Sequence, residues 1–243
     1  MIKLAKYFIQ SLFVYFFFII GRLIGLSQSR RVFSFLFKKV GQNFKSQKII
    51  EKNLNIFNSS LSPEEKRNIV ENMWSNYGMT FIEYIYLSKF RNSNNFVDIK
   101  GEEILHNVIR NNEPVVFISG HFSNFELMSM EITKKNIKLA TIYRPLNNYF
   151  LNPFMEYLRK KYVCANQIKK GLNGVRESID YIRKGFSIAL MIDQRVSEGE
   201  KINFFGKPAL TTTLPAQLAL KFKLQIIPVF IERTDKKKFK ITF

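Results

Sequence analysis

The sequence predicts an α/β fold, with a mostly parallel central sheet between two layers of helices, preceded by an apolar N-terminal helix and a helical lead-in. Three observations predict it. From about residue 96, short apolar runs alternate with stretches of helical spacing, as in strand–helix–strand units. Residues 47–92 have helical periodicity without such runs, and residues 7–21 carry no charge. At 243 residues, 46% of them hydrophobic, the chain can bury a substantial core in one domain.

Residues 1–40 are predicted to anchor the chain to a membrane. Residues 12–20 are an unbroken apolar run, and basic residues lie on both sides of it: Lys3, Lys6, Arg22, Arg30 and Arg31. Because a bilayer core needs about 20 residues, three arrangements stay open: a thin or tilted span, an interfacial helix, or a hydrophobic helix packed on the domain. Basic flanks suit anionic headgroups and favour the anchor. No small-residue cleavage signal lies between residues 21 and 31, which argues against a removed signal peptide.

Residues 41–243 are predicted to form the globular domain, with a helical lead-in at 41–95 and a sheet region at 96–243. Apolar runs predict strands at 114–119, 137–143, 187–192, 225–231 and 239–243. Helices are expected between them, near 124–135, 148–161, 172–184 and 212–223. In parallel sheets of this kind, ligands bind outside the carboxyl ends of the strands.

The lead-in contains one well-marked helix start. The sequence Ser62-Pro63-Glu64-Glu65 places proline at the first helical position, and apolar residues then follow at helical spacing: Ile69, Met73, Trp74 and Tyr77. We interpret this stripe as core packing. Gly78 is expected to end the helix before the aromatic run 81–86.

Composition narrows the function classes. Lys+Arg number 38 against 19 Asp+Glu, which favours an anionic partner such as phospholipid, phosphorylated saccharide or acidic protein. Nucleic acid ranks last, because no nucleic-acid-binding motif accompanies the charge. One cysteine, Cys164, excludes an intrachain disulfide, and two histidines leave too few ligands for a structural zinc site. No Rossmann, P-loop or nucleophile-elbow string occurs, so we expect a reaction without cofactor or metal.

The candidate site begins at residues 120–126, Gly-His-Phe-Ser-Asn-Phe-Glu, which follow the first predicted strand. A neutral imidazole at His121 can take a proton from a hydroxyl near pH 7, and a carboxylate at Glu126 can orient the ring. This pair suits a strand-to-helix turn. One alternative stays open: Ser123-x-x-Glu126 is also a capping box, in which His121 is an ordinary turn residue.

Two other predicted strands end in charged or proton-handling residues. Tyr143-Arg144-Pro145 follows the second, and Asp193-Gln194-Arg195 follows the third. Each alone is weak, because arginines and aspartates in loops are usually surface residues. Their convergence with His121 at one sheet edge is what a site requires.

These residues resemble a known family. The matching set is His121-x4-Glu126, Tyr143-Arg144-Pro145-x-x-Asn148, Asn152-Pro153, Arg159, Asp193-Gln194 and Phe204-Phe205-Gly206-x-x-Ala209-x-Thr211. In this order it looks like the bacterial lipid A biosynthesis acyltransferases, the late lauroyl/myristoyl transferases of the lysophospholipid acyltransferase superfamily. The likeness runs through nearly the whole chain, although H-x4-[DE] alone marks only the superfamily.

The resemblance implies an enzyme of the bacterial inner membrane, its active site facing the cytoplasm, that moves a fatty acyl chain from acyl carrier protein, or from acyl-CoA in some relatives, onto a hydroxyl of a lipid A precursor. By matching positions, His121 would be the general base and Glu126 its orienting carboxylate. Arg144, Arg159 and Asp193 would help to form the site and bind substrate. The implied partners are acyl carrier protein, the phosphorylated glycolipid and anionic phospholipid.

Some alternative functions and residue roles stay open. A glycerolipid acyltransferase acting on a lysophospholipid would use the same dyad, and a membrane-anchored anion-binding protein would need the anchor and the charge but not His121. Phe204-Phe205 is interpreted as core packing or, less readily, as part of the acyl pathway, and Thr211-Thr212-Thr213 as a helix cap. Relatives usually continue beyond the position of Phe243, so a shortened member or a truncated product is expected.

Overall fold

The structure, a computed structural model, describes residues 2–43, 46–197, 199–234 and 238–243. The chain folds into two compact units. The sheet unit combines the chain up to Ser11 with Leu87–Glu200 and Leu210–Phe243. The helical unit combines Leu12–Tyr86 with Lys201–Ala209.

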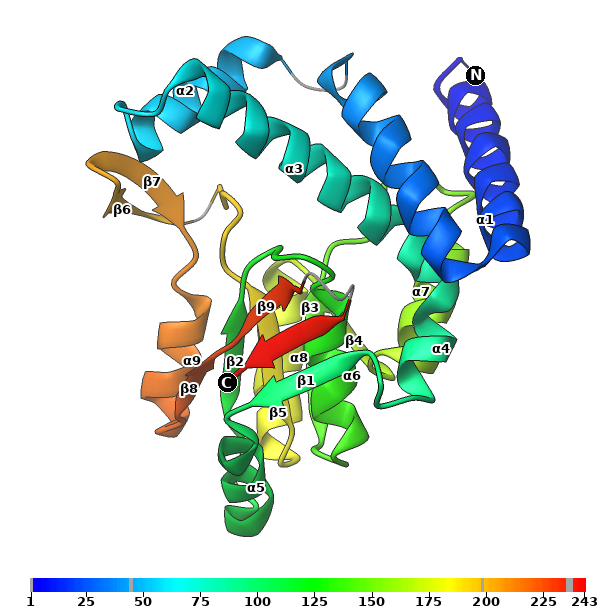
Figure 1. Ribbon diagram of the computed structural model, residues 1–243. Coiled ribbons are helices and arrows are strands. Elements are labelled where there is room, and N and C mark those ends of the chain that lie inside the picture. The colour runs from blue at the N-terminus through cyan, green and yellow to red at the C-terminus, as the bar shows by residue number, and fades with distance from the viewer. Residues whose placement is uncertain (1, 44–45, 198, 235–237) are drawn as a thin grey trace. The chain divides into compact units, whose positions relative to one another are not determined.

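The sheet unit is built on a parallel five-stranded sheet, in the order β4-β3-β5-β2-β8 (Figure 1). Its strands are β2 Val116–Ser119, β3 Leu139–Tyr143, β4 Asn166–Lys169, β5 Ser187–Met191 and β8 Ile226–Pro228. Central strands of such a sheet are buried on both faces and therefore have near-continuous apolar sequences. The predicted parallel sheet is confirmed.

Helices cover both faces of this sheet. Those of the sheet unit are α4 Leu87–Arg91, α5 Glu102–Asn111, α6 Glu126–Lys134, α7 Asn152–Tyr162, α8 Leu172–Arg183 and α9 Leu214–Phe222. Ile182 of α8 and Leu218 of α9 pack in one core cluster with Val116 and Ile188. Side chains alternate along a strand, so Phe117, which is fully buried, faces the opposite side. The helices predicted near 124–135, 148–161, 172–184 and 212–223 are confirmed. Each begins at the predicted residue or a few residues after it.

The strand predicted at 225–231 is two strands in two sheets. A second, three-stranded sheet contains β1 Val97–Lys100, β10 Phe239–Thr242 and β9 Phe230–Arg233, with β1 parallel and β9 antiparallel to β10. β8 ends at Pro228, which has no amide N–H to continue the ladder. The Val229 amide still donates to the Ile118 carbonyl at 2.8 Å, and the chain then enters β9. The strand predicted at 239–243 is confirmed as β10.

The helical unit contains most of α1, Ile2–Val40, which is broken at Gly25. Gly25 has φ 79°, in the left-handed region that favours glycine. The rings of Phe17 and Phe33, one on each side of the break, lie 5.6 Å apart, so the two arms fold back on each other. The Tyr86 hydroxyl donates to the Gly21 carbonyl at 2.6 Å near the fold.

Among the described residues, α1 is the helix long and apolar enough to cross a membrane, with a mean hydropathy of 1.9 over a window of 18 residues that is 22% buried. At 1.5 Å per residue, the arm before Gly25 is about 34 Å long, against a hydrocarbon core of about 30 Å. Its length and composition fit the predicted anchor.

The rest of the helical unit consists of α2 Gln47–Phe57, α3 Pro63–Glu83, the short 3-10 turns Gly41–Asn43 and Tyr84–Tyr86, and residues 201–209 of a hairpin formed by β6 Glu200–Phe204 and β7 Lys207–Thr211. The predicted start of α3 is confirmed: the Ser62 side chain accepts from the Glu65 amide, and the Glu65 carboxylate accepts from the Ser62 amide.

The predicted end of α3 at Gly78 is wrong, because the helix continues to Glu83. A Cβ at Gly78 would lie 2.2 Å from the carbonyl oxygen of Phe33. Glycine serves close helix packing here rather than termination.

Candidate functional site

The sheet register brings His121 and Asp193 together. Strands β2 and β5 are parallel neighbours, and Ser119 pairs with Met191 at their carboxyl ends. His121 and Asp193 each lie two residues beyond that pair, so both leave the same edge of the sheet side by side. This edge is where ligands bind in parallel sheets.

Two hydrogen bonds join the residues. The His121 backbone amide donates to Asp193 Oδ2 at 2.7 Å, and the imidazole Nδ1 lies 2.7 Å from Asp193 Oδ1. An ionised Asp193 accepts a hydrogen bond from Nδ1–H, which leaves the lone pair of the neutral ring on Nε2. Nε2 lies 3.3 Å from Gln194 Nε2, and the ring of Phe125 packs edge-on against the imidazole at 4.6 Å. The imidazole is thus held with one nitrogen able to accept a proton.

The electrostatics of Asp193 support the ionised form. Partial burial opposes ionisation, but the hydrogen bonds from the His121 ring and backbone, together with the charge of that ring when protonated, hold the pKa of Asp193 below its ordinary value. Asp193 therefore remains a carboxylate at neutral pH and can stabilise an imidazolium.

Glu126 has a different partner. It is the first residue of α6 and is buried, and its Oε1 accepts a hydrogen bond from Arg159 Nε of α7 at 2.7 Å. Arg159 also lies over the ring of Tyr143, 5.9 Å from its centroid. The structure therefore brings together two pairs, His121 with Asp193 and Glu126 with Arg159, and Asp193 occupies the Nδ1 position for which Glu126 was the expected group.

The capping-box alternative does not match the structure. α6 begins at Glu126, with Phe125 in the N-cap position and no side-chain cap hydrogen bond there. Ser123 has φ 48° and lies in the turn before the helix. Glu126 is thus the first helical residue rather than the third, as a capping box would need.

A carboxylate absent from the sequence predictions extends this network. The Tyr143 hydroxyl donates to Glu156 Oε1 at 2.5 Å, and Asn152 Nδ2 donates to the same oxygen at 2.9 Å. Burial and the hydrogen bond to Glu156 raise the pKa of Tyr143, while the bond from Tyr143 lowers the pKa of Glu156. Spacing could have found Glu156, because it lies one helical turn before Arg159, on the same face of α7.

The four groups His121, Glu126, Arg144 and Arg159 line one cavity of about 410 Å³. Apolar side chains complete its wall, among them Met128, Ile142, Leu190 and Leu214. Asp193 is joined to the cavity through its hydrogen bonds to His121. All five predicted site residues therefore belong to this region, which combines a histidine, two arginines, two carboxylates and an apolar wall.

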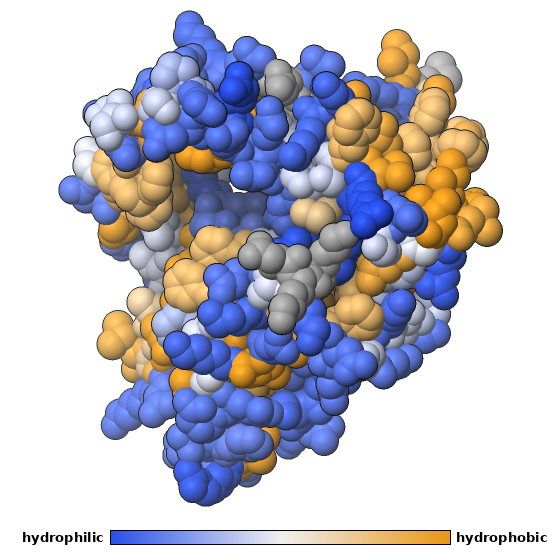
Figure 2. Space-filling view, viewed as in Figure 1, coloured by the Kyte–Doolittle hydropathy of each residue, from blue (hydrophilic) through white to orange (hydrophobic). Residues whose placement is uncertain are grey.

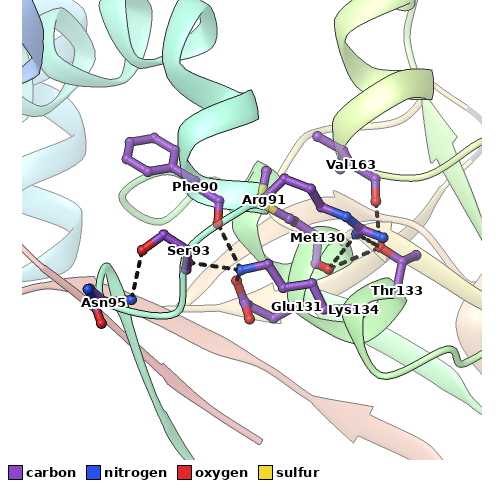
Figure 3. A network of polar contacts seen from close by, with 9 residues as sticks. All are labelled: Phe90, Arg91, Ser93, Asn95, Met130, Glu131, Thr133, Lys134 and Val163. Carbon is purple, nitrogen blue, oxygen red and sulfur yellow. Dashed lines mark hydrogen bonds and ion pairs between the residues drawn. The ribbon is translucent and has the colours of Figure 1, made fainter.

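A second polar network anchors α6, the helix that carries Glu126 (Figure 3). Arg91 of α4 donates from Nη1 to the Met130 carbonyl at 3.1 Å and to Thr133 Oγ1 at 2.6 Å. Lys134 pairs with Glu131 at 2.7 Å, both side chains being largely buried. Burial raises the pKa of Glu131, and Lys134 opposes that shift. These cations satisfy groups in the last turns of α6 and so fix its position.

Comparison with known proteins decides the family. Residues 2–243 match the model of the bacterial lipid A biosynthesis acyltransferase family. The chain belongs to this family. It is 22% identical over 248 residues to lipid A biosynthesis acyltransferase 2 of Shigella flexneri, covering 98% of this chain and 78% of that protein. It is also 22% identical over 136 residues to the lipid A biosynthesis myristoyltransferase of Escherichia coli strain K12, covering 55% of this chain and 42% of that protein.

Membership makes the chain an acyltransferase of lipid A biosynthesis, as the sequence resemblance implied. An acyltransferase has to activate a hydroxyl, stabilise negative charge and shelter a hydrocarbon chain, and this lipid A acyltransferase has a histidine, two arginines and an apolar wall in one place.

Proposed function

We propose that this acyltransferase moves a fatty acyl chain from an acyl carrier protein thioester to a hydroxyl of a lipid A precursor, with His121 as general base. The observation that carries the proposal is the pair of 2.7 Å contacts between His121 and Asp193 beside the cavity. They hold the imidazole in the tautomer with its lone pair on Nε2, which is the tautomer a general base needs at this cavity.

The chemistry needs no covalent enzyme intermediate. His121 Nε2 takes the proton of the acceptor hydroxyl as the oxygen attacks the thioester carbonyl. Asp193 stabilises the imidazolium that forms, as a buried or hydrogen-bonded carboxylate does in other base-activated acyl transfers. The tetrahedral intermediate then collapses, the C–S bond breaks, and the imidazolium returns its proton to the leaving thiolate.

The Glu126–Arg159 pair is proposed to act on developing charge. A guanidinium held by a carboxylate at the wall of the cavity is preorganised to stabilise an oxyanion or to bind an anionic group of the substrate. Arg144, which is exposed at the same cavity, suits a phosphate of the acceptor. In this proposal Asp193 takes the orienting role, whereas orientation of His121 by Glu126 stays a prediction that paired variants test.

The proposed partners follow from charge. The formal net charge is +19 at pH 7. Acyl carrier protein is acidic and lipid A precursors carry phosphates, so a basic enzyme attracts both. We further propose that residues 1–40 anchor the enzyme in the bacterial inner membrane, that residues 41–243 form the acyltransferase domain, and that its site faces the cytoplasm.

One competition assay tests the proposal. Membranes containing the enzyme receive radiolabelled acyl-acyl carrier protein, with a lipid A precursor and a lysophospholipid offered together. Label should reach the precursor and should depend on His121. The matched control is His106→Ala, because His106 is the other histidine and its side chain is 63% exposed on α5.

The outcomes separate the candidates. Loss of transfer in His121→Ala with retention in His106→Ala supports the proposal. His121-dependent label on the lysophospholipid alone would make the enzyme a glycerolipid acyltransferase. Equal transfer by the parent and by folded His121→Ala would refute the general base, and substrate binding without turnover in the parent would favour a binding protein.

A further inference from the structure

The helical unit presents a group of apolar side chains at the tip of the β6–β7 hairpin and the end of α2. This tip cluster consists of Phe57, Ile202, Phe204 and Phe205, which are 55%, 47%, 64% and 52% exposed. In Figure 2, hydrophobic surface gathers where Figure 1 draws the hairpin. Every residue of β6 is exposed. The prediction that Phe204-Phe205 is core packing is therefore wrong.

The rings of the tip cluster contact one another. Phe204 and Phe205 lie 4.6 Å apart at an interplanar angle of 81°, and Phe57 lies 5.4 Å from Phe205 at 70°. This mutual edge-to-face packing still leaves about half of each ring exposed. Contiguous exposed apolar side chains of this kind mark an interaction surface, in contrast to scattered single residues.

The backbone conformation of the turn also indicates an interaction surface. Phe205 has φ 49° and Gly206 has φ 69°, so both central residues of the turn are in the left-handed region. Asn or Gly is the relaxed choice at such positions, and a bulky aromatic residue there is strained. The chain thus has a strained phenylalanine at an exposed tip, where a polar residue would suit both the backbone and water better.

The lysines beside the tip cluster indicate which partner this surface contacts. Lys201 precedes the aromatic pair in β6, and Lys207 follows the turn in β7. Aromatic side chains flanked by lysines suit the interface of an anionic bilayer, because the rings enter the acyl boundary while the ammonium groups stay with the headgroups. The same unit contains residues 12–40 of α1, the helix that is apolar enough to cross a membrane.

We propose that the tip cluster is a second membrane contact, which inserts into the headgroup region of an anionic phospholipid bilayer. It would fix the orientation of the helical unit on the membrane in addition to the anchoring by α1. The tip cluster lies on the surface of the helical unit, and its contact with the membrane does not depend on the identity of the acyl donor or acceptor.

The depth of a spin label tests the proposal on the full chain in vesicles. Ile202→Cys places the label beside the rings, since Ile202 and Phe204 point to the same face of β6. Cys164 is buried and is the chain's only cysteine, so Cys164→Ala provides the background. Accessibility to oxygen and to a water-soluble nickel chelate is measured in vesicles of phosphatidylcholine, with and without phosphatidylglycerol.

The label should be protected from the nickel chelate and exposed to oxygen, more strongly in the vesicles with phosphatidylglycerol. Adding Phe204→Thr with Phe205→Asn should abolish the protection, and asparagine suits the left-handed backbone, so the turn is kept. Phe230→Thr, which removes a phenylalanine that is 60% exposed outside the tip cluster, is the matched control and should leave the label protected.

Three results would overturn the proposal. One is a label that the nickel chelate reaches equally well in the two kinds of vesicle and in a sample without vesicles. Another is protection that survives the loss of both tip phenylalanines. The third is protection that arises only when acyl carrier protein is added, which would assign the tip cluster to a protein partner.

Discussion

Replacing Asp193 by asparagine tests which carboxylate orients the imidazole of His121, the proposed general base. Asparagine keeps the size of the side chain but loses the charge and one acceptor. If its oxygen accepts from the His121 backbone amide, its amino group faces Nδ1 and favours the tautomer with the proton on Nε2, which cannot act as a base. The structure therefore predicts a fall in kcat rather than a rise in KM.

The magnitude follows from the contacts. A hydrogen bond to a charged group contributes about 1.5–3 kcal/mol. The side chains of His121 and Asp193 are 31% and 36% exposed, so solvent screens part of this energy. We expect a loss of about 1–2 kcal/mol of transition-state stabilisation, which at about 1.36 kcal/mol per tenfold is a fall of about 5- to 30-fold in kcat.

The assay compares Asp193→Asn with Glu126→Gln, and measures kcat and KM for both substrates. Glu126→Gln loosens Arg159 and should change KM for the anionic substrate more than kcat. Orientation of His121 by Asp193 is refuted if Asp193→Asn stays within about threefold of the parent in kcat while Glu126→Gln loses more than about 100-fold, a size typical of general-base catalysis. Glu126 would then be the group that orients His121.

Three further predictions concern stability. Gly78→Ala should destabilise the helical unit by about 1–3 kcal/mol, seen as a lower Tm, because its Cβ would lie 2.2 Å from the Phe33 carbonyl oxygen; an unchanged Tm would contradict the close packing. In a double-mutant cycle, Glu126→Gln and Arg159→Met should be coupled by about 1–3 kcal/mol in chemical unfolding, since the pair is 8% and 12% exposed. The folded pKa of Asp193 is lowered, so its contribution to stability is present above its unfolded pKa of about 4 and is lost as pH falls through the folded value. The Tm difference between the parent and Asp193→Asn should therefore shrink as the pH falls below about 4, and a difference that grows over this range would show the opposite sign.

The sequence predicts those strands that are apolar on both faces. Residues 116–118 and 188–191 are continuous apolar runs because helices cover both sides of the sheet. β1, with the sequence Val-Asp-Ile-Lys, and β4, with Asn-Gln-Ile-Lys, were missed because a strand of four residues with polar positions has too little pattern to detect. The hairpin at 200–211 was missed because it has no buried face and therefore no alternation of apolar and polar residues.

Site residues were predicted from position, but their partners were not. His121 and Asp193 were both expected at the edge of the sheet, yet the imidazole was paired with Glu126 because that residue is close in sequence. The contact between His121 and Asp193 spans 72 residues. It depends on β5 being the direct neighbour of β2, and neither composition nor spacing gives the order of strands in a parallel sheet.

This topology divides the site into two halves with different supports. His121 and Asp193 follow directly from the adjacent strands β2 and β5, so hydrogen bonds of the sheet fix their separation. Glu126 and Arg159 lie on α6 and α7, and α6 is tied to α4 by Arg91. Proton transfer is sensitive to small displacements, whereas an electrostatic contact to a phosphate or oxyanion falls off more gradually with distance. Support by adjacent strands therefore belongs to the pair that we propose for proton transfer, and support by packed helices belongs to the pair that we propose for binding developing charge.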